Sequence, residues 1–97
     1  MKTRTREGIA EREEVLARVR RLLIDGLDVK AEMEAIDPDT PLFGSGLGLD
    51  SIDAVELALL LEEHFGVKWE DGPMGRAGMR TVNSVVDMII RHRSHAQ

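Results

Sequence analysis

The chain has 97 residues, which is enough for one small domain with a single core. It contains no cysteine, and this excludes disulfides, thiolate metal sites and a cysteine nucleophile. The net charge of −5 is unevenly placed, because residues 28–63 hold ten acids and one lysine, a net −9. Such an anionic segment argues against nucleic acid as a partner and favours basic protein surfaces, which it attracts over a distance.

The first residues are basic, but no apolar stretch follows them. We therefore expect residues 1–7 to form a flexible basic terminus rather than a signal peptide. No apolar run approaches the roughly 20 residues that a membrane span needs. These observations predict a cytoplasmic protein with a folded domain at 8–93 and a short tail at 94–97.

The first periodic segment lies between Gly8 and Asp25. Its apolar residues recur at helical spacing along one face: Val15, Leu16, Val19, Leu22 and Leu23. Gly26 follows as a natural stop, because glycine adopts the left-handed backbone conformation without steric cost. The pattern predicts an amphipathic helix that turns its charged side chains toward solvent.

No helical period continues through residues 27–49, where prolines and glycines interrupt the chain. A connection of this length is uncommon unless it is ordered or functional. We expect four apolar side chains to hold it against the core, namely Ile36, Leu42, Phe43 and Leu47. A short helical turn is expected within residues 31–35.

A second helix is predicted from Ser51 to about Phe65, with Asp50 as its N-cap. At 100° per residue, one face gathers the residues expected in the core: Ala54, Leu57, Ala58, Leu61 and Phe65. The opposite face carries Ile52, Glu56, Leu59 and Glu63. Since one small core cannot cover both sides of a helix, we predict an exposed partner-binding face that includes Ile52 and Leu59. The alternative is that the long loop folds back over these two side chains.

After Gly66, the chain is rich in glycine between Glu70 and Arg80, which disfavours a stable helix but leaves room for one short turn. Trp69 is expected at the edge of the core. Thr81 then caps a last helix with a continuous apolar stripe: Val82, Val85, Val86, Ile89 and Ile90. No strand pattern occurs. The predicted fold class is all-α, a small bundle of three to four helices with a long loop between the first two.

The sequence gives little support for a metal site or a catalytic site. His92 and His95 have no third ligand at a suitable spacing, and residues 37–48 lack the glycine and glutamate that a calcium loop requires. We do not expect Ser51 to act as the nucleophile of a hydrolase, because the candidate general base, His64, lies thirteen residues further along the same helix. At about 1.5 Å per residue this is roughly 20 Å, too far for a general base.

Ser51 nevertheless occupies a distinctive place, at the junction of the glycine-rich turn and the second helix. Free N–H groups and the helix dipole favour a phosphate at such a position. The alternative is an ordinary serine in the first turn of a helix.

The segment Leu47–Leu57 resembles the L-G-x-D-S-L-D-x-V-E-L motif of acyl carrier proteins. Residues 61–67 are similar to the family's L-E-E-x-F-x-V, and residues 81–82 to the T-V that opens its last helix. The resemblance implies a non-catalytic carrier whose Ser51 receives 4′-phosphopantetheine, with Asp50 as a second cofactor-binding residue. The thiol of that arm then carries an acyl group as a thioester, in fatty-acid, polyketide or related specialised biosynthesis.

The resemblance also implies a monomer that docks on basic patches of phosphopantetheinyl transferase, acyl-ACP synthetase, ketosynthase or acyltransferase enzymes. The implied docking residues all lie on the second helix: Ile52, Asp53, Glu56, Leu59, Glu62 and Glu63. The glycine-rich segment and the basic N-terminus depart from the family pattern and indicate a specialised stand-alone bacterial carrier. A carrier of aminoacyl or other short acids, and a helical interaction module without a cofactor, remain as alternatives.

Overall fold

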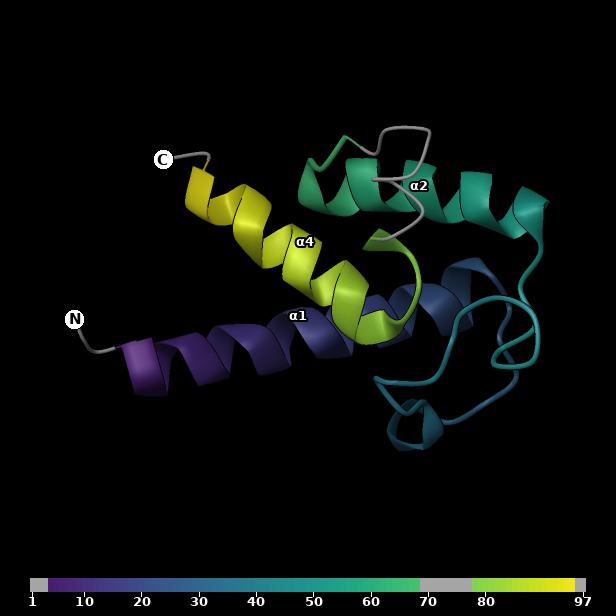
Figure 1. Ribbon diagram of the computed structural model, residues 1–97, viewed down its shortest axis with the longest axis horizontal. Helices are drawn as coiled ribbons and strands as arrows, with labels where there is room; N and C mark the ends of the chain where they lie inside the picture. The colour runs from purple at the N-terminus through teal and green to yellow at the C-terminus, as the bar shows by residue number, and fades with distance from the viewer. Residues whose placement is uncertain (1–3, 69–77, 96–97) are drawn as a thin grey trace.

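The fold, a computed structural model that describes residues 4–68 and 78–95, is built from helices joined by one long loop. The elements are α1 (Arg4–Gly26), a 3-10 turn η1 (Met33–Ala35), α2 (Ser51–Phe65) and α4 (Val82–His95). Within these described ranges, the only β-type pairs are two isolated bridges. In Figure 1, the loop between α1 and α2 lies at one end of the molecule, and the start of α1 and the end of α4 lie toward the other. The predicted all-α class is confirmed.

α1 differs from its prediction at both ends. It begins at Arg4 rather than Gly8, because residues 4–7 contain no helix breaker. At its C-terminus the left-handed residue is Asp28 (φ 61°), and not Gly26 as predicted. Gly26 has another role: a Cβ atom at this position would lie 2.5 Å from a terminal methyl group of Leu60 in α2, so the glycine leaves room for that side chain. The glycine therefore permits a close approach of two helices rather than a turn.

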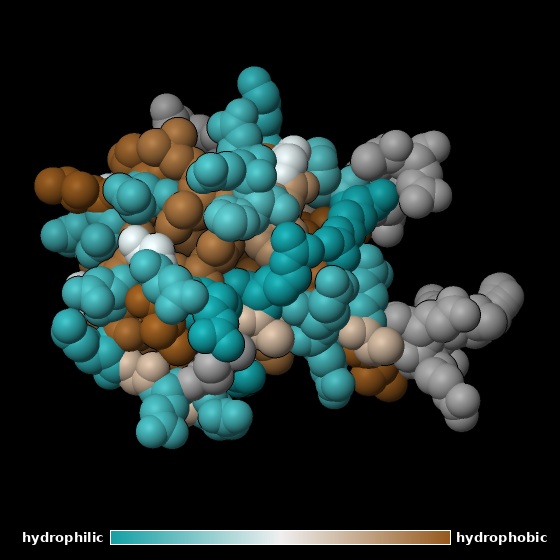
Figure 2. All heavy atoms as spheres, turned by 180° about the vertical axis from the view of Figure 1, so that it is seen from behind, coloured by the Kyte–Doolittle hydropathy of each residue, from teal (hydrophilic) through white to brown (hydrophobic). Residues whose placement is uncertain are grey.

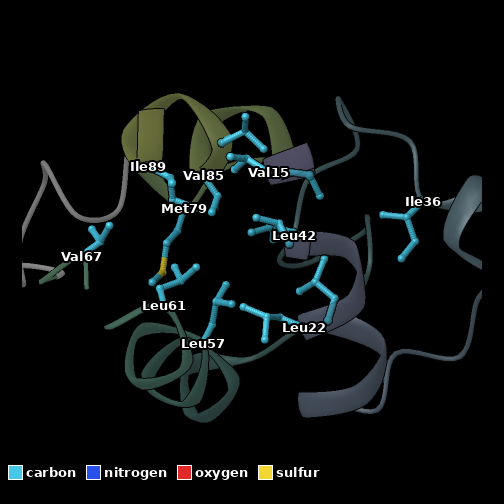
Figure 3. Close-up of a cluster of buried hydrophobic side chains, with 14 of the residues drawn as sticks. Val15, Leu22, Ile36, Leu42, Leu57, Leu61, Val67, Met79, Val85 and Ile89 are labelled. Atoms are coloured by element: carbon cyan, nitrogen blue, oxygen red, sulfur yellow. The ribbon is translucent and has the colours of Figure 1, made fainter. Parts of the chain in front are cut away.

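The core is formed by the predicted stripes of the three helices. From α1 and α4 the fully buried side chains are Val15, Val19, Leu23, Val82, Val85, Val86 and Ile89. Leu57 and Leu61 of α2 face them, with Ala54, Ala58 and Phe65 partly buried at the margin. Figure 3 shows Met79 directed toward Leu61, in the space between α2 and α4. Burial of these side chains is the main source of stability in a domain of this size.

The long loop is ordered by the apolar side chains that the sequence singled out, and by a further one. Ile36 and Leu42 are buried, Phe43 and Leu47 are partly buried, and Leu49 joins the core as well. Figure 3 shows Leu42 among side chains of α1. The Arg20 side chain of α1 donates to the Ile36 carbonyl over 3.0 Å. The expected short turn is present as η1.

α4 starts as predicted. The Ser84 N–H donates to Thr81 Oγ1 (3.1 Å) and the Thr81 N–H to Ser84 Oγ (2.9 Å), a reciprocal cap. The helix continues to His95, past the expected tail boundary at 94. The expectations for Trp69 and for residues 70–77 lie outside the described residues.

Candidate functional site

The turn that precedes α2 is closed by hydrogen bonds within the loop. The Leu47 N–H donates to the Pro41 carbonyl (2.9 Å), and the Leu49 N–H to the Leu42 carbonyl (3.0 Å). Gly48 has a left-handed backbone (φ 77°). At Gly46 a Cβ atom collides with the Pro41 carbonyl oxygen, so only glycine fits. The turn buries Leu49 and delivers the next two residues to the surface.

A capping box fixes the start of α2. Asp50 Oδ1 accepts from the Asp53 N–H (3.0 Å), and Asp53 Oδ2 accepts from the Asp50 N–H (3.0 Å). The predicted N-cap is thus confirmed, whereas the capping role of Asp53 was missed. Its signal is the spacing of an N-cap aspartate and an acidic residue three positions later.

The hydrogen bonds of the capping box also change the pKa of Asp50. The Asp53 N–H, assisted by that of Ile52, holds the pKa of the Asp50 carboxyl below its ordinary value, with desolvation opposing in part. Asp50 is therefore an anion at neutral pH, hydrogen-bonded to the N-terminus of α2.

Ser51 is the first residue of α2 and is exposed. Its side chain lies on the surface at a helix N-terminus, a position that favours a phosphate group. His64 lies in the last turn of the same helix, so the two side chains are at opposite ends of α2. The structure does not bring together a serine nucleophile and a histidine base here.

The outer face of α2 is exposed, as the helical periodicity predicted. Ile52 and Leu59 retain 74% and 60% of their accessible surface, and Glu56, Glu62 and Glu63 are exposed around them. The described part of the loop does not fold back over these side chains. Figure 2 shows apolar side chains interspersed with hydrophilic ones at the end where α2 begins. Asp53 differs from the other predicted docking residues, since it is partly buried and engaged in the cap.

One residue of this face was missed. Val55 is 63% exposed and lies between Ile52 and Leu59 on the helix. The signal was present in the sequence, because positions 52, 55 and 59 follow the i, i+3, i+7 spacing of one helical stripe.

The far end of α2 is held to its neighbours by arginines. The Arg18 guanidinium of α1 lies 4.3 Å from the centre of the Phe65 ring and donates to the His64 carbonyl over 3.1 Å. Arg93 of α4 lies on the same ring at 5.9 Å and pairs with Glu11 at 3.2 Å. Both ends of α2 are therefore held by contacts: the first turn by the capping box and the last turn by arginines of α1 and α4.

Two negative findings concern the described ranges. In residues 4–68 and 78–95, no three potential metal ligands gather in one place. No helix within this part of the chain has the length and apolar character to cross a membrane.

The structure thus shows a small helical domain with an exposed serine at the start of an acidic helix. Residues 17–89 match the family model for the phosphopantetheine attachment site. The chain is 37% identical over 76 residues to an acyl carrier protein of Thermosynechococcus vestitus, an alignment that covers 78% of this chain and 88% of the relative. It is 34% identical over 79 residues to one of Coprothermobacter proteolyticus, covering 81% and 90%.

The chain belongs to the acyl carrier protein family, and the resemblance of the sequence motifs is confirmed. Members of this family are non-catalytic carriers with a covalently attached 4′-phosphopantetheine arm.

Proposed function

We propose that Ser51 is the residue to which 4′-phosphopantetheine is attached. The observation that carries the proposal is its place as the exposed first residue of α2, between a rigid turn and a capped helix. Leu49 anchors the turn in the core, and the Asp50–Asp53 box fixes the direction of the first helical turn. Once attached, the arm supplies a terminal thiol that holds an acyl group as a thioester.

The outer face of α2 serves as the docking surface for the enzymes that load and process the cargo. Three exposed apolar side chains, Ile52, Val55 and Leu59, form its centre, and Glu56, Glu62 and Glu63 surround them. Such a face fits basic patches with an apolar centre on phosphopantetheinyl transferase, acyl-ACP synthetase, ketosynthase or acyltransferase enzymes.

The cargo is an acyl intermediate of fatty-acid, polyketide or related specialised biosynthesis. The basic N-terminus and the glycine-rich segment 70–80 support a specialised stand-alone carrier. The chemistry at Ser51 is the same whether the acid is a long acyl chain or a short or aminoacyl one.

The experiment that tests the attachment is an intact mass measurement after incubation with coenzyme A and a phosphopantetheinyl transferase of broad specificity. We expect a gain of one phosphopantetheine group in the wild type and none in Ser51→Ala. Ser45→Ala is the matched control, since Ser45 is an exposed serine in the preceding turn, and it should keep the full gain. A gain that survives in Ser51→Ala, or its absence in the wild type while a known carrier is modified, contradicts the proposal.

A further inference from the structure

Asn83, in the first turn of α4, connects three parts of the fold. Its backbone N–H donates to the Pro38 carbonyl (2.9 Å), and its Nδ2 donates to Asp39 Oδ1 (2.6 Å), both in the long loop. Its Oδ1 accepts from Arg12 of α1 over 2.9 Å. All the hydrogen-bonding groups of the side chain are thus directed at partners distant in sequence.

Arg12 completes this arrangement. Its second terminal nitrogen binds Asp87 Oδ1 at 2.7 Å, one turn further along α4. The guanidinium is therefore held between two residues of α4, Asn83 and Asp87. This fixes the orientation of the Asn83 amide, whose NH₂ group then faces the loop.

Next to this contact, further backbone hydrogen bonds connect α4, the loop and the turn that precedes Ser51. Pro41 pairs with Thr81, and the Leu42 N–H donates to the Arg80 carbonyl at 2.9 Å. The carbonyls of Pro41 and Leu42 then accept the N–H groups of Leu47 and Leu49, the residues that close the turn. Asn83 therefore holds residues 38–39, which lie directly before the residues 41–42 on which the turn before Ser51 is built.

We propose that Asn83 is a positioning residue for the attachment of phosphopantetheine at Ser51. By donating to Asp39, the side-chain amide of Asn83 holds the loop against α4 in the arrangement that presents Ser51 to the transferase, and Arg12 of α1 keeps that amide in place. The inference rests on the proposed function of Ser51. Residues 27–50 contain few helical hydrogen bonds of their own, so the loop depends on such contacts to offset the conformational entropy of ordering it.

The chemistry of the contact allows a test by exchange of donor and acceptor. Asn83→Asp retains the acceptor for Arg12 but places a second carboxylate against Asp39. Asp39→Asn is the matched control, because its amide oxygen still accepts from Asn83. In the double variant Asn83→Asp/Asp39→Asn the donor and acceptor are exchanged, and the hydrogen bond forms again.

The kinetic readout is the modification of each variant by the transferase. If the loop is correctly placed in only a fraction of molecules, the apparent KM rises by the inverse of that fraction, while kcat is unchanged. We expect about a fivefold rise of KM for Asn83→Asp, and values within about twofold of wild type for Asp39→Asn and the double variant. A role in global stability alone moves neither constant as long as the protein stays folded.

The second readout is hydrogen exchange of the backbone, which does not depend on the transferase. In Asn83→Asp the N–H groups of Leu42, Leu47 and Leu49 should exchange about tenfold faster, while those of Leu57 and Val86 in the helices stay unchanged. The double variant should restore the protection. Should Asn83→Asp fail to fold, Asp39→Ala removes the same hydrogen bond from the exposed side and should raise KM about fivefold, beyond the twofold range expected for the controls.

Three results overturn the inference. The first is a KM of the transferase for Asn83→Asp that equals its KM for the wild type. The second is a raised KM that the double variant does not lower, and the third is unchanged exchange at Leu42, Leu47 and Leu49. If the wild type itself is not modified, the proposed function of Ser51 fails and the positioning role falls with it, so the two failures are distinguishable.

Discussion

At the scale of single residues, Gly46 has the strictest steric requirement in the loop. A methyl group there collides with the Pro41 carbonyl, the acceptor of the Leu47 N–H. Gly46→Ala should therefore shift the backbone and lower the free energy of unfolding by roughly 2 kcal/mol. Urea denaturation followed by circular dichroism measures this difference.

Gly44 provides the control for this prediction. It has a left-handed backbone (φ 71°), and a Cβ atom at this position has nothing within 4 Å. Asparagine tolerates that conformation, so Gly44→Asn should cost far less than Gly46→Ala. Equal losses in the two variants would show that the collision at Gly46 is relieved by a small local shift.

Asp50 makes the stability of α2 depend on pH. Folding lowers the pKa of Asp50 from its ordinary value of 3.8. Its contribution to stability is therefore present above pH 3.8 and is lost as the pH falls through the lower, folded pKa. Asp50→Asn retains a cap acceptor without the charge. In acid titrations of stability between pH 6 and pH 2, we expect a smaller loss in Asp50→Asn than in the wild type. If both proteins lost the same stability between pH 6 and pH 2, groups other than Asp50 would be responsible for the acid sensitivity.

The residues that the sequence identified correctly at this scale act locally. Asp50 and Thr81 cap the helices that follow them, and a cap needs only its own first turn. Gly26 was interpreted wrongly as a left-handed stop, because that conformation is adopted by Asp28 and Gly26 instead leaves room for the Leu60 side chain of another helix. A local pattern contains no information on which residue will approach from a distant part of the chain.

At the scale of elements, one turn of α2 carries both a buried and an exposed leucine, so stability and the proposed docking can be tested separately. Leu57 is fully buried in the core, whereas Leu59 retains 60% of its accessible surface. Leu57→Ala should lower the free energy of unfolding by about 2–5 kcal/mol. The same truncation at Leu59 should cost within about 0.5 kcal/mol but weaken binding to partner enzymes. Chemical denaturation and a binding isotherm on both variants test the pair, and a strongly destabilised Leu59→Ala would contradict an exposed docking face.

The apolar stripes of the three helices were predictable because burial imposes the helical period on the sequence. The contact of Asn83 with Arg12 and Asp39, in contrast, was not predictable from the sequence. Arg12, Asn83 and Asp39 come from α1, α4 and the loop, separated by 71 and 44 positions, and polar side chains of this kind have no period. Their meeting follows from the packing of α1 on α4, which only the folded chain reveals.

At the scale of the whole molecule, charge is concentrated in one part of the chain. Residues 28–63, which form the loop and α2, carry a net −9, while the remainder is net positive. This distribution should steer the α2 face toward basic surfaces and speed encounter at low ionic strength. The steering depends on where the charge is placed and not on its total, so the two can be separated by variants of equal net charge.

Reversing two acids of the docking face tests this separation. Glu56→Lys/Glu63→Lys changes the net charge from −5 to −1, as does Glu13→Lys/Asp25→Lys on α1. All four side chains are exposed, so each substitution should change stability by no more than about 0.5 kcal/mol. The pair on α2 should raise the KM of the transferase about tenfold and reduce its dependence on salt, whereas the pair on α1 should change it about twofold. Equal effects of the two pairs would mean that total charge, rather than the face of α2, attracts the partner.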